Sequence, residues 1–316
     1  MKLSLSTAPH ILSSDTTRRR MTDVMTALLP ASMVGIYLFG LHSLWILLVS
    51  IVSAVAAEYA WQKGTGKMVT ISDFSAAVTG LLVGLNMPSS APLWLPIAGS
   101  VFGIIVVKQV FGGIGHNFLN PALAARAMLL TSWPARMTTF YLPQRLLLFG
   151  ASSSAPIGDA VTSATPLMKG GTALFDLFMG NIPGTIGEVC KAAILVGLLY
   201  LIISRTIDVQ IPVLFIGTVA LMSFIIGKDP LAAILSGGVL FGAVFMATDY
   251  VTRPMLIPGQ CIFAIGAGLI VVLIREYGTY PEGVTYAILL MNVVTPLLDK
   301  FIRRRVYGEV KKHAET

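Results

Sequence analysis

The sequence predicts an all-α integral membrane protein with about ten transmembrane helices, arranged as an inverted repeat of two five-helix halves. Three observations predict this fold class. The composition is strongly apolar, ten apolar runs follow one another along the chain, and short motifs recur about half a chain apart. The positions of Lys and Arg then predict which side of the membrane each loop faces.

The composition excludes several classes of protein. Of the 316 residues, 55% are hydrophobic and only 12% are Asp, Glu, Lys or Arg, against about 25% charged residues in typical soluble domains. The mean hydropathy is +0.80. A soluble enzyme would have too few surface charges, and a disordered chain would be far less apolar. The net charge of +7 does not indicate nucleic-acid binding, because the basic residues lie at membrane edges and not in one patch.

Ten apolar runs are bounded by charged residues and by Gly or Pro. They lie at residues 22–40, 43–60, 73–87, 93–110, 121–133, 187–204, 209–226, 230–248, 257–274 and 283–302. We expect each to be helical, because a backbone exposed to lipid must satisfy its own hydrogen bonds. The fifth run is short and begins at Asn120-Pro121. Ten spans of about 20 residues each would use about 200 residues.

Lys and Arg are unevenly distributed between the loops. With the N-terminus in the cytoplasm, 15 of the 22 basic residues fall in cytoplasmic segments. This bias agrees with the positive-inside rule and requires an even number of spans, with eight and twelve as the alternatives to ten. No apolar region precedes Arg18-Arg19-Arg20, so we expect the first span to act as an uncleaved insertion signal. The sequence therefore predicts a multi-pass protein of the cell (inner) membrane with both termini cytoplasmic.

The two halves of the chain resemble each other. Gly80-Leu-Leu-Val-Gly84 recurs as Gly238-Val-Leu-Phe-Gly242, and Pro121 and Pro281 each open the last run of a half. Because each half has an odd number of spans, the second copy enters the membrane inverted, as in many transporters. Residues 1–133 and 187–316 are the predicted halves, joined by an extracytoplasmic loop, 134–186. The Gly-xxx-Gly pairs themselves indicate close helix packing.

The long polar loop carries the segment Asp159-Ala-Val-Thr162-Ser163-Ala164-Thr165-Pro166-Leu167. Taken alone, this is an ordinary Ser/Thr-rich turn before a proline. No Walker lysine loop and no Gly-x-Gly-x-x-Gly after a strand is present, which argues against an ATP-driven pump subunit and a direct nicotinamide site. Two cysteines, Cys190 and Cys261, cannot supply the four thiolates of an ordinary iron–sulfur cluster. No histidine has metal-ligand spacing.

The segment 159–167 resembles the flavinylation site of membrane flavoproteins, in which the last Thr carries FMN. Two further stretches, residues 112–122 (Gly112 to Ala122) and 245–249 (Phe245 to Asp249), resemble signatures of one family. This family comprises the D component of the Rnf electron-transport complex and the B component of the sodium-pumping NADH:quinone oxidoreductase. The resemblance extends over residues 20–305, and the short N-terminus favours the Rnf branch. Ser163 stands where glycine is common, and Tyr250 where proline is expected.

The resemblance implies FMN in phosphoester linkage to Thr165, with Asp159, Thr162, Ser163 and Ala164 completing the attachment motif. It implies a second, non-covalent riboflavin in the membrane, whose residues the sequence does not reveal. The implied function is a subunit of an ion-translocating ferredoxin:NAD oxidoreductase, coupling electron transfer to Na⁺ or H⁺ movement. The implied partners are the other Rnf components (A, B, C, E and G), a flavin transferase during maturation, and membrane lipid.

Charged residues in or beside apolar runs are candidates for an ion pathway. Most of them lie at the ends of runs, where helix capping or snorkelling explains them equally well. Asp73 and Asp249 are the strongest candidates, because each lies beside a repeat-related run with a Gly-xxx-Gly pair. Asp249 has a structural alternative, an ion pair with Arg253 four residues later.

Two other functions remain open at this point. A ten-span inverted repeat is also typical of a solute transporter or channel of urea-transporter-like architecture, without redox chemistry. A purely structural scaffold for other subunits is the third interpretation.

Overall fold

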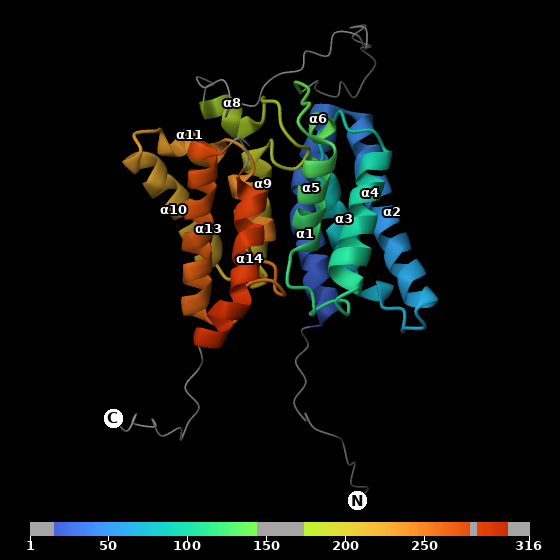
Figure 1. Cartoon of the computed structure of the whole chain (residues 1–316). Coiled ribbons are helices and arrows are strands. Elements are labelled where there is room, and N and C mark those ends of the chain that lie inside the picture. Colours follow the sequence, from blue (N-terminus) through green and yellow to red (C-terminus); the bar gives the residue numbers. More distant parts are fainter. Residues whose placement is uncertain (1–15, 144–173, 279–282, 303–316) are drawn as a thin grey trace, which may run out of the picture.

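The computed structural model describes residues 16–143, 174–278 and 283–302, and these residues are almost entirely helical (Figure 1). Within them, the β structure is one isolated bridge between Pro88 and Thr185. The helices of the first half are α1 (Thr17–Phe39), α2 (Leu41–Gly64), η1 (Ile71–Asp73), α3 (Ser75–Leu85), α4 (Trp94–Phe102), η2 (Gly103–Gln109), α5 (Pro121–Ser132) and α6 (Pro134–Met137). The later helices are α8 (Leu174–Met179), α9 (Lys191–Ile203), α10 (Gln210–Ile225), α11 (Pro230–Leu235), α12 (Val239–Phe241), η3 (Gly242–Met246), α13 (Ile257–Tyr277) and α14 (Val284–Phe301).

All ten predicted apolar runs contain helix, which confirms an all-α multi-pass membrane protein. Four helices, α1, α2, α13 and α14, are long and apolar enough to cross a bilayer by themselves. Four shorter apolar segments are α3, α4 with η2, α9 and α10. The number ten for the spans stays a prediction, because helices such as α3, with 11 residues, are shorter than the roughly 20 residues of a full span.

The eighth run, 230–248, is not one helix but three pieces. It divides into α11, α12 and the π-helical segment η3, with a break at Ser236-Gly237-Gly238. Gly237 has a φ of +63°, which glycine adopts without a Cβ clash. Arg275 of α13 donates to the carbonyls of Ala233 and Ser236 at 2.7 and 3.0 Å, so it satisfies acceptors that a continuous helix would use itself.

Helix starts follow ordinary capping chemistry. The Thr16 hydroxyl accepts from Arg19 N–H at the start of α1. Asn120 caps α5, and Asp229 caps α11. In both cases a proline follows at the first helical position, where its missing N–H costs nothing.

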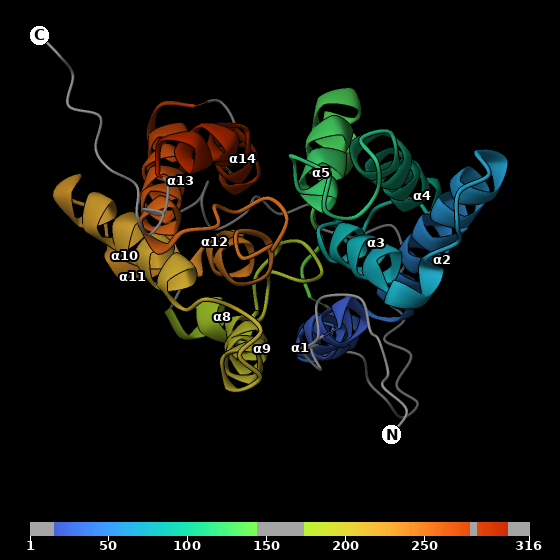
Figure 2. The ribbon, with the colours of Figure 1, turned by 90° about the horizontal axis from the view of Figure 1, so that it is seen from below.

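The helices form two groups that lie side by side (Figure 2). In the first group, α2 packs against α3 and α4, and α4 packs against α5. In the second, α10 packs against α11, η3 and α13, and α13 packs against α14. The contacts α1–α9 and α5–α14 join the two groups.

Glycines allow the closest approaches between helices, as the Gly-xxx-Gly pairs predict. A Cβ on Gly80 of α3 would lie 2.7 Å from the carbonyl oxygen of Ser50 on α2. A Cβ on Gly238 would lie 2.5 Å from a carboxylate oxygen of Glu188. The packing interpretation of these glycines is therefore confirmed.

The start of α1 and the end of α14 lie at the same end of the molecule, and α6 and α8 lie at the opposite end (Figure 1). This arrangement agrees with termini on one side of the membrane and the predicted loop on the other. Which side is cytoplasmic stays a prediction from the charge distribution.

Candidate functional site

The predicted flavin attachment segment lies outside the described residues. This holds for Asp159, Thr162, Ser163, Ala164 and Thr165. The described chain stops at Pro143, shortly after α6, and resumes at Leu174 with α8, in both cases at the end of the molecule that carries these two helices (Figure 1). Attachment of FMN to Thr165 therefore stays a prediction.

A cavity lies between the two helix groups, towards the end of the molecule where α1 begins. Helices α1, α3, α5 and α9 contribute to its walls, together with the π-helical segments η2 and η3. Its volume is about 80 Å³, below the roughly 300–1,000 Å³ of typical small-molecule sites. Its polar lining consists of Ser75, Thr79, Lys108, Asn117, Asn120, Thr248 and Asp249. The cavity is thus mainly apolar, with a few polar groups that can orient a ligand.

Both signature stretches of the sequence meet at this cavity. Asn117 and Asn120 come from residues 112–122, and Thr248 and Asp249 end residues 245–249. The Asn120 side chain caps α5 through the N–H groups of Ala122 and Leu123, and its amide donates to the Met246 carbonyl at 3.4 Å. Two segments 126 residues apart are therefore held together at one site.

Asp249 is a cavity residue in the turn after η3. Its carboxylate accepts a hydrogen bond from the Thr252 hydroxyl at 3.2 Å. Burial raises the pKa of this carboxyl, and hydrogen bonds from Thr252 and the backbone of Val251 oppose that effect. Arg253 forms its ion pair with Asp208, and its charge also acts on Asp249, where it lowers the pKa against the larger effect of burial.

Tyr250, where proline was expected, joins the two helix groups at the edge of the cavity. Its hydroxyl accepts from Arg20 of α1 at 3.3 Å. The guanidinium groups of Arg20 and Arg253 lie 5.9 and 4.9 Å from the ring centroid, within cation–π range. The aromatic side chain therefore forms contacts that a proline at this position lacks.

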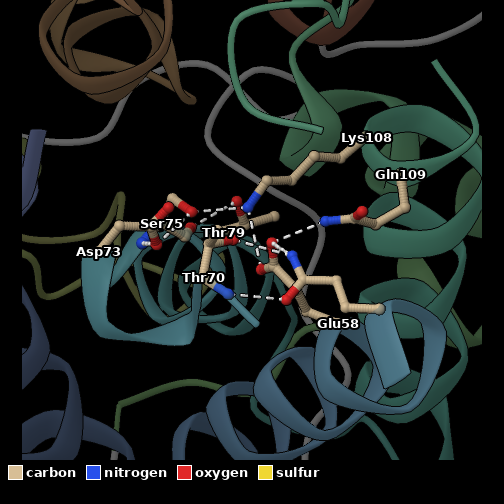
Figure 3. Close-up of polar contacts among 8 residues, drawn as sticks. Glu58, Thr70, Asp73, Ser75, Thr79, Lys108 and Gln109 are labelled. Atoms are coloured by element: carbon tan, nitrogen blue, oxygen red, sulfur yellow. Dashed lines mark hydrogen bonds and ion pairs between the residues drawn. The ribbon is translucent and has the colours of Figure 1, made fainter. Parts of the chain in front are cut away.

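A buried polar cluster adjoins the cavity, and Figure 3 shows its side chains. Glu58 of α2 is 1% exposed and Lys108 of η2 is 2% exposed. The Lys108 ammonium bonds to the Glu58 carboxylate at 2.9 Å and to the Ser75 hydroxyl at 2.6 Å. Gln109 donates to the other Glu58 oxygen at 2.7 Å. The buried charges are therefore paired and hydrogen-bonded, as a membrane interior requires.

Asp73 is connected to the cavity through Ser75. Its Oδ1 accepts from the Ser75 N–H at 2.8 Å and from the Ser75 hydroxyl at 2.7 Å. Asp73 is partly exposed and Ser75 is buried. Asp249 lines the cavity directly, whereas Asp73 is connected to it only through Ser75, and an ion pathway at these two residues stays a prediction.

A second buried cluster joins the two groups farther from the cavity mouth. Arg126 of α5 contacts the Glu188 carboxylate at 3.2 Å and also donates to Asn86. The Thr185 hydroxyl donates to the same Glu188 oxygen, and Lys191 donates to the carbonyl of Gly237 at 2.8 Å. Sequence reasoning missed Arg126, although a lone Arg within the fifth apolar run was the signal.

Four other charged residues in or beside the apolar runs have structural partners. The Asp229 carboxylate accepts from Leu231 N–H, and Arg275 bonds the broken run as described. Glu276 pairs with Lys228 at 2.6 Å, and Asp299 accepts from Met255 N–H at 3.0 Å. Helix capping, carbonyl binding and ion pairing account for these four charged residues without an ion pathway. Within the described ranges, no group of three or more His, Cys, Asp or Glu side chains is placed to hold a metal ion.

Comparison with known proteins gives one consistent result. The sequence profile of the NQR2, RnfD, RnfE family matches residues 4–308. The D component of the Na⁺-translocating ferredoxin:NAD⁺ oxidoreductase complex of Acetobacterium woodii is 45% identical, over 100% of this chain and 99% of that protein. The D component of the proton-translocating ferredoxin:NAD⁺ oxidoreductase complex of Clostridium ljungdahlii is 40% identical, over 96% of each chain. The D component of an ion-translocating oxidoreductase complex of Stutzerimonas stutzeri is 38% identical, over 92% of each.

Proposed function

Because the chain belongs to the NQR2, RnfD, RnfE family, we propose that it is the D component of an ion-translocating ferredoxin:NAD⁺ oxidoreductase complex. In this role it relays electrons through bound flavin within the membrane. The observation that carries the proposal is the similarity over the full length to D components with that activity in their names. The two relatives are named for different ions, so the coupling ion, Na⁺ or H⁺, is not assigned.

FMN on Thr165 is the covalent cofactor in this proposal. Its support is the motif from Asp159 to Thr165 and the position of the flanking helices α6 and α8 at one end of the molecule. A phosphoester holds the flavin through its phosphate and leaves the ring free to exchange electrons. Thr165 is then an anchor, and the redox chemistry belongs to the cofactor.

A denaturing gel viewed under ultraviolet light tests the covalent flavin. The protein from cells that contain the flavin transferase should fluoresce, and protein from cells without the transferase should not. Thr165→Ala should abolish the fluorescence while the membrane helices stay folded, because they do not depend on that side chain. Thr162→Ala is the matched control and should keep it. Fluorescence that persists in Thr165→Ala contradicts the assignment. A colourless wild-type protein favours a transporter without redox chemistry.

The resemblance also implies a non-covalent riboflavin, and the proposal assigns no residues to it. The cavity between the helix groups has a volume of about 80 Å³, which is too small for the isoalloxazine ring. Its polar side chains Asn117, Asn120 and Thr248 donate hydrogen bonds to backbone carbonyls of the chain itself.

The inverted repeat is part of the same proposal. The packing of α2 with α3 and α4 corresponds to the packing of α10 with η3 and α13, and the paired contacts α1–α9 and α5–α14 relate equivalent helices. Residues 1–133 and 187–316 are then the two repeats, and the loop 134–186 carries the flavin site. An ion path through broken helices, with Asp73 and Asp249 at its entrance, follows this architecture.

The partners are the other components of the complex, A, B, C, E and G, and the surrounding lipid. Large apolar side chains are exposed on the outer helices, for example Val52 on α2 and Phe224 on α10, and a lipid or protein surface explains them. The proposal includes no nucleic acid.

A further inference from the structure

The break within residues 230–248 is bonded by two positively charged side chains, Arg275 and Lys191. We propose that the Lys191 ammonium occupies a monovalent-cation site at this break, so that the broken helix carries a fixed charge of its own in place of a dissociable ion. The inference goes beyond the proposed function and does not depend on flavin chemistry. Neither Lys191 nor the break lines the cavity between the helix groups.

On either side of the break, the backbone bonds to itself. The Ala232 carbonyl accepts from the Ser236 N–H at 2.9 Å, and the Gly238 carbonyl accepts from the Gly242 N–H at 2.8 Å. Both are helical bonds between residues four apart. The interruption of the helix is therefore confined to the few residues between them.

Within the break, charged side chains take the place of backbone N–H donors. The Arg275 guanidinium bonds to the carbonyls of Ala233 and Ser236. The Lys191 ammonium bonds to the Gly237 carbonyl at 2.8 Å. Backbone carbonyl oxygens released from a helix are also the ligands that bind Na⁺ and K⁺ in transporters and channels. The break therefore has the oxygen ligands of a cation site.

Lys191 is in the position that a bound ion would take. It is the first residue of α9, which packs against α12, and it is only 1% exposed. Its ammonium bonds to the carbonyl oxygens of Glu188 and Gly237, so oxygens from two segments of the chain meet at one positive charge. A lysine ammonium is a compact point charge. It therefore resembles a monovalent ion more closely than the planar guanidinium of Arg275 does.

The Glu188 carboxylate makes this site more negative. Its Oε1 accepts from Arg126 and Thr185, whereas its Oε2 is buried and has no hydrogen-bond partner among the described residues. A Cβ on Gly238 would lie 2.5 Å from Oε2, so this oxygen lies directly beside the break. Buried charges in proteins are paired or coordinate metal ions. The charge of Lys191 acts on this carboxylate, so the chain itself supplies the cation.

The assignment has a consequence for the ion path. In many transporters, the carbonyls of a broken helix coordinate the transported ion. Here the same kind of oxygens bond to side chains that cannot dissociate. The break therefore keeps its shape without an ion, and the coupling ion does not bind there.

Replacement of Lys191 by a small residue should allow a free ion to bind. Lys191→Ala leaves the oxygens in place and opens the space of the side chain to Na⁺ or K⁺. The reporter is the thiol of Cys190, which is buried next to Lys191. In a Cys261→Ser background, Cys190 is the only cysteine of the chain. The purified complex is treated with N-ethylmaleimide in NaCl, KCl or choline chloride at equal ionic strength, and the label on this chain is measured by mass spectrometry.

The wild-type side chain should give slow labelling at the same rate in all three salts. Lys191→Ala should label at least about tenfold faster in choline chloride, because a buried carboxylate without its countercharge is costly and the break then opens. NaCl, KCl or both should restore slow labelling. Fast labelling in all three salts means that Lys191 acts only as a hydrogen-bond donor. Slow labelling in all three means that no cation is needed. Either result overturns the proposal.

Lys191→Met is the matched control, because it fills the space of the lysine side chain but has no charge. It should label fast in all three salts, since no room is left for an ion. Protection of Lys191→Met by NaCl or KCl to the same extent as Lys191→Ala shows that the ions act elsewhere in the complex, and it contradicts the site. Growing cells contain K⁺, so failure of Lys191→Ala to accumulate in them also overturns the proposal.

Discussion

The Glu188 carboxylate is buried between residues that arrive from three parts of the chain. Arg126 is on α5, Asn86 follows α3, and Thr185 and Lys191 flank Glu188 on its own segment. Such a cluster has little effect on stability while it is complete, because ion pairing offsets the loss of hydration. Removal of one partner is costly, because the other charge stays buried.

We therefore predict that Arg126→Met lowers the stability of the complex by about 3–5 kcal/mol. Glu188→Gln in the same background should recover a large part of this loss, since it removes the stranded carboxylate. Thermal unfolding of the purified complex, followed by intrinsic fluorescence, measures both effects. Equal stability of the single and double variants contradicts the pairing.

A substitution of Asp249 shows whether this residue couples ion transport to electron transfer or only supports assembly of the complex. Asp249→Asn retains size and most hydrogen bonding but removes the charge. If this carboxylate lies on the ion path, the variant complex should assemble with its flavins and pass electrons, while ion transport into sealed vesicles falls. Arg253→Gln is run alongside, because it removes the Arg253 charge that acts on Asp249 and the ion pair with Asp208 but leaves the Asp249 carboxylate in place. A complex that falls apart, or that transports ions normally, rules out the coupling role.

Asp249 also gives a stability prediction with a definite sign. Its pKa is raised in the folded protein, so its stabilising contribution is present at acid pH and is lost as the pH rises through the folded-state pKa. At neutral pH, Asp249→Asn should therefore raise the melting temperature. The difference in melting temperature from wild type should shrink as the pH falls toward the range in which ordinary carboxyl groups titrate. A difference that grows in acid contradicts the raised pKa.

At the scale of the elements, two glycines provide a matched pair of substitutions. Gly80→Ala places a methyl group 2.7 Å from the Ser50 carbonyl, and overpacking of this kind costs about 1–3 kcal/mol. Gly217 of α10 has nothing within 4 Å of an added Cβ, so Gly217→Ala should be neutral or stabilise by up to about 1 kcal/mol. The melting temperatures of the two variants check the prediction. A neutral Gly80→Ala shows that α2 and α3 separate without cost.

The helix positions were predictable because an apolar run in lipid has few alternatives to a helix. Whether each run forms one continuous helix was not predictable. In the run 230–248, Ser236-Gly237-Gly238 is a sequence signal for a turn, but the carbonyls freed at the break are bonded by Arg275, about 40 residues later, and that contact is not visible in the run. In the same way, Glu58 and Lys108 are individually visible in the sequence, but their pairing across 50 residues depends on how α2 packs against η2.

For the whole molecule, the positive-inside distribution predicts sidedness. Ser153→Cys, in the loop beyond the described residues, should react with a membrane-impermeant thiol reagent applied to intact cells. The native cysteines, Cys190 and Cys261, are buried and partly buried, so a background without them serves as the control. Labelling that occurs only in inverted vesicles reverses the predicted orientation.

The start of α1 and the end of α14 lie at the end of the molecule opposite to α6 and α8 (Figure 1), which agrees with an even number of crossings. The cavity was not predictable at this scale. Its walls come from both halves of the chain, and residues such as Val24 and Val244 are separated by most of the sequence. Only the two signature stretches pointed to the residues that meet there.

The shortness of α3 has an electrical consequence. At 11 residues and about 1.5 Å per residue, this helix covers about 16 Å, roughly half of a 30 Å hydrocarbon core. The cavity at its lower end is lined by polar side chains such as Ser75 and Lys108 beside apolar ones. When water fills this cavity, the low-dielectric barrier is narrowest between the cavity and the opposite surface, and a transmembrane voltage falls mainly across that layer. An elementary charge that crosses the layer then gains nearly the full 2.3 kcal/mol or so per 100 mV.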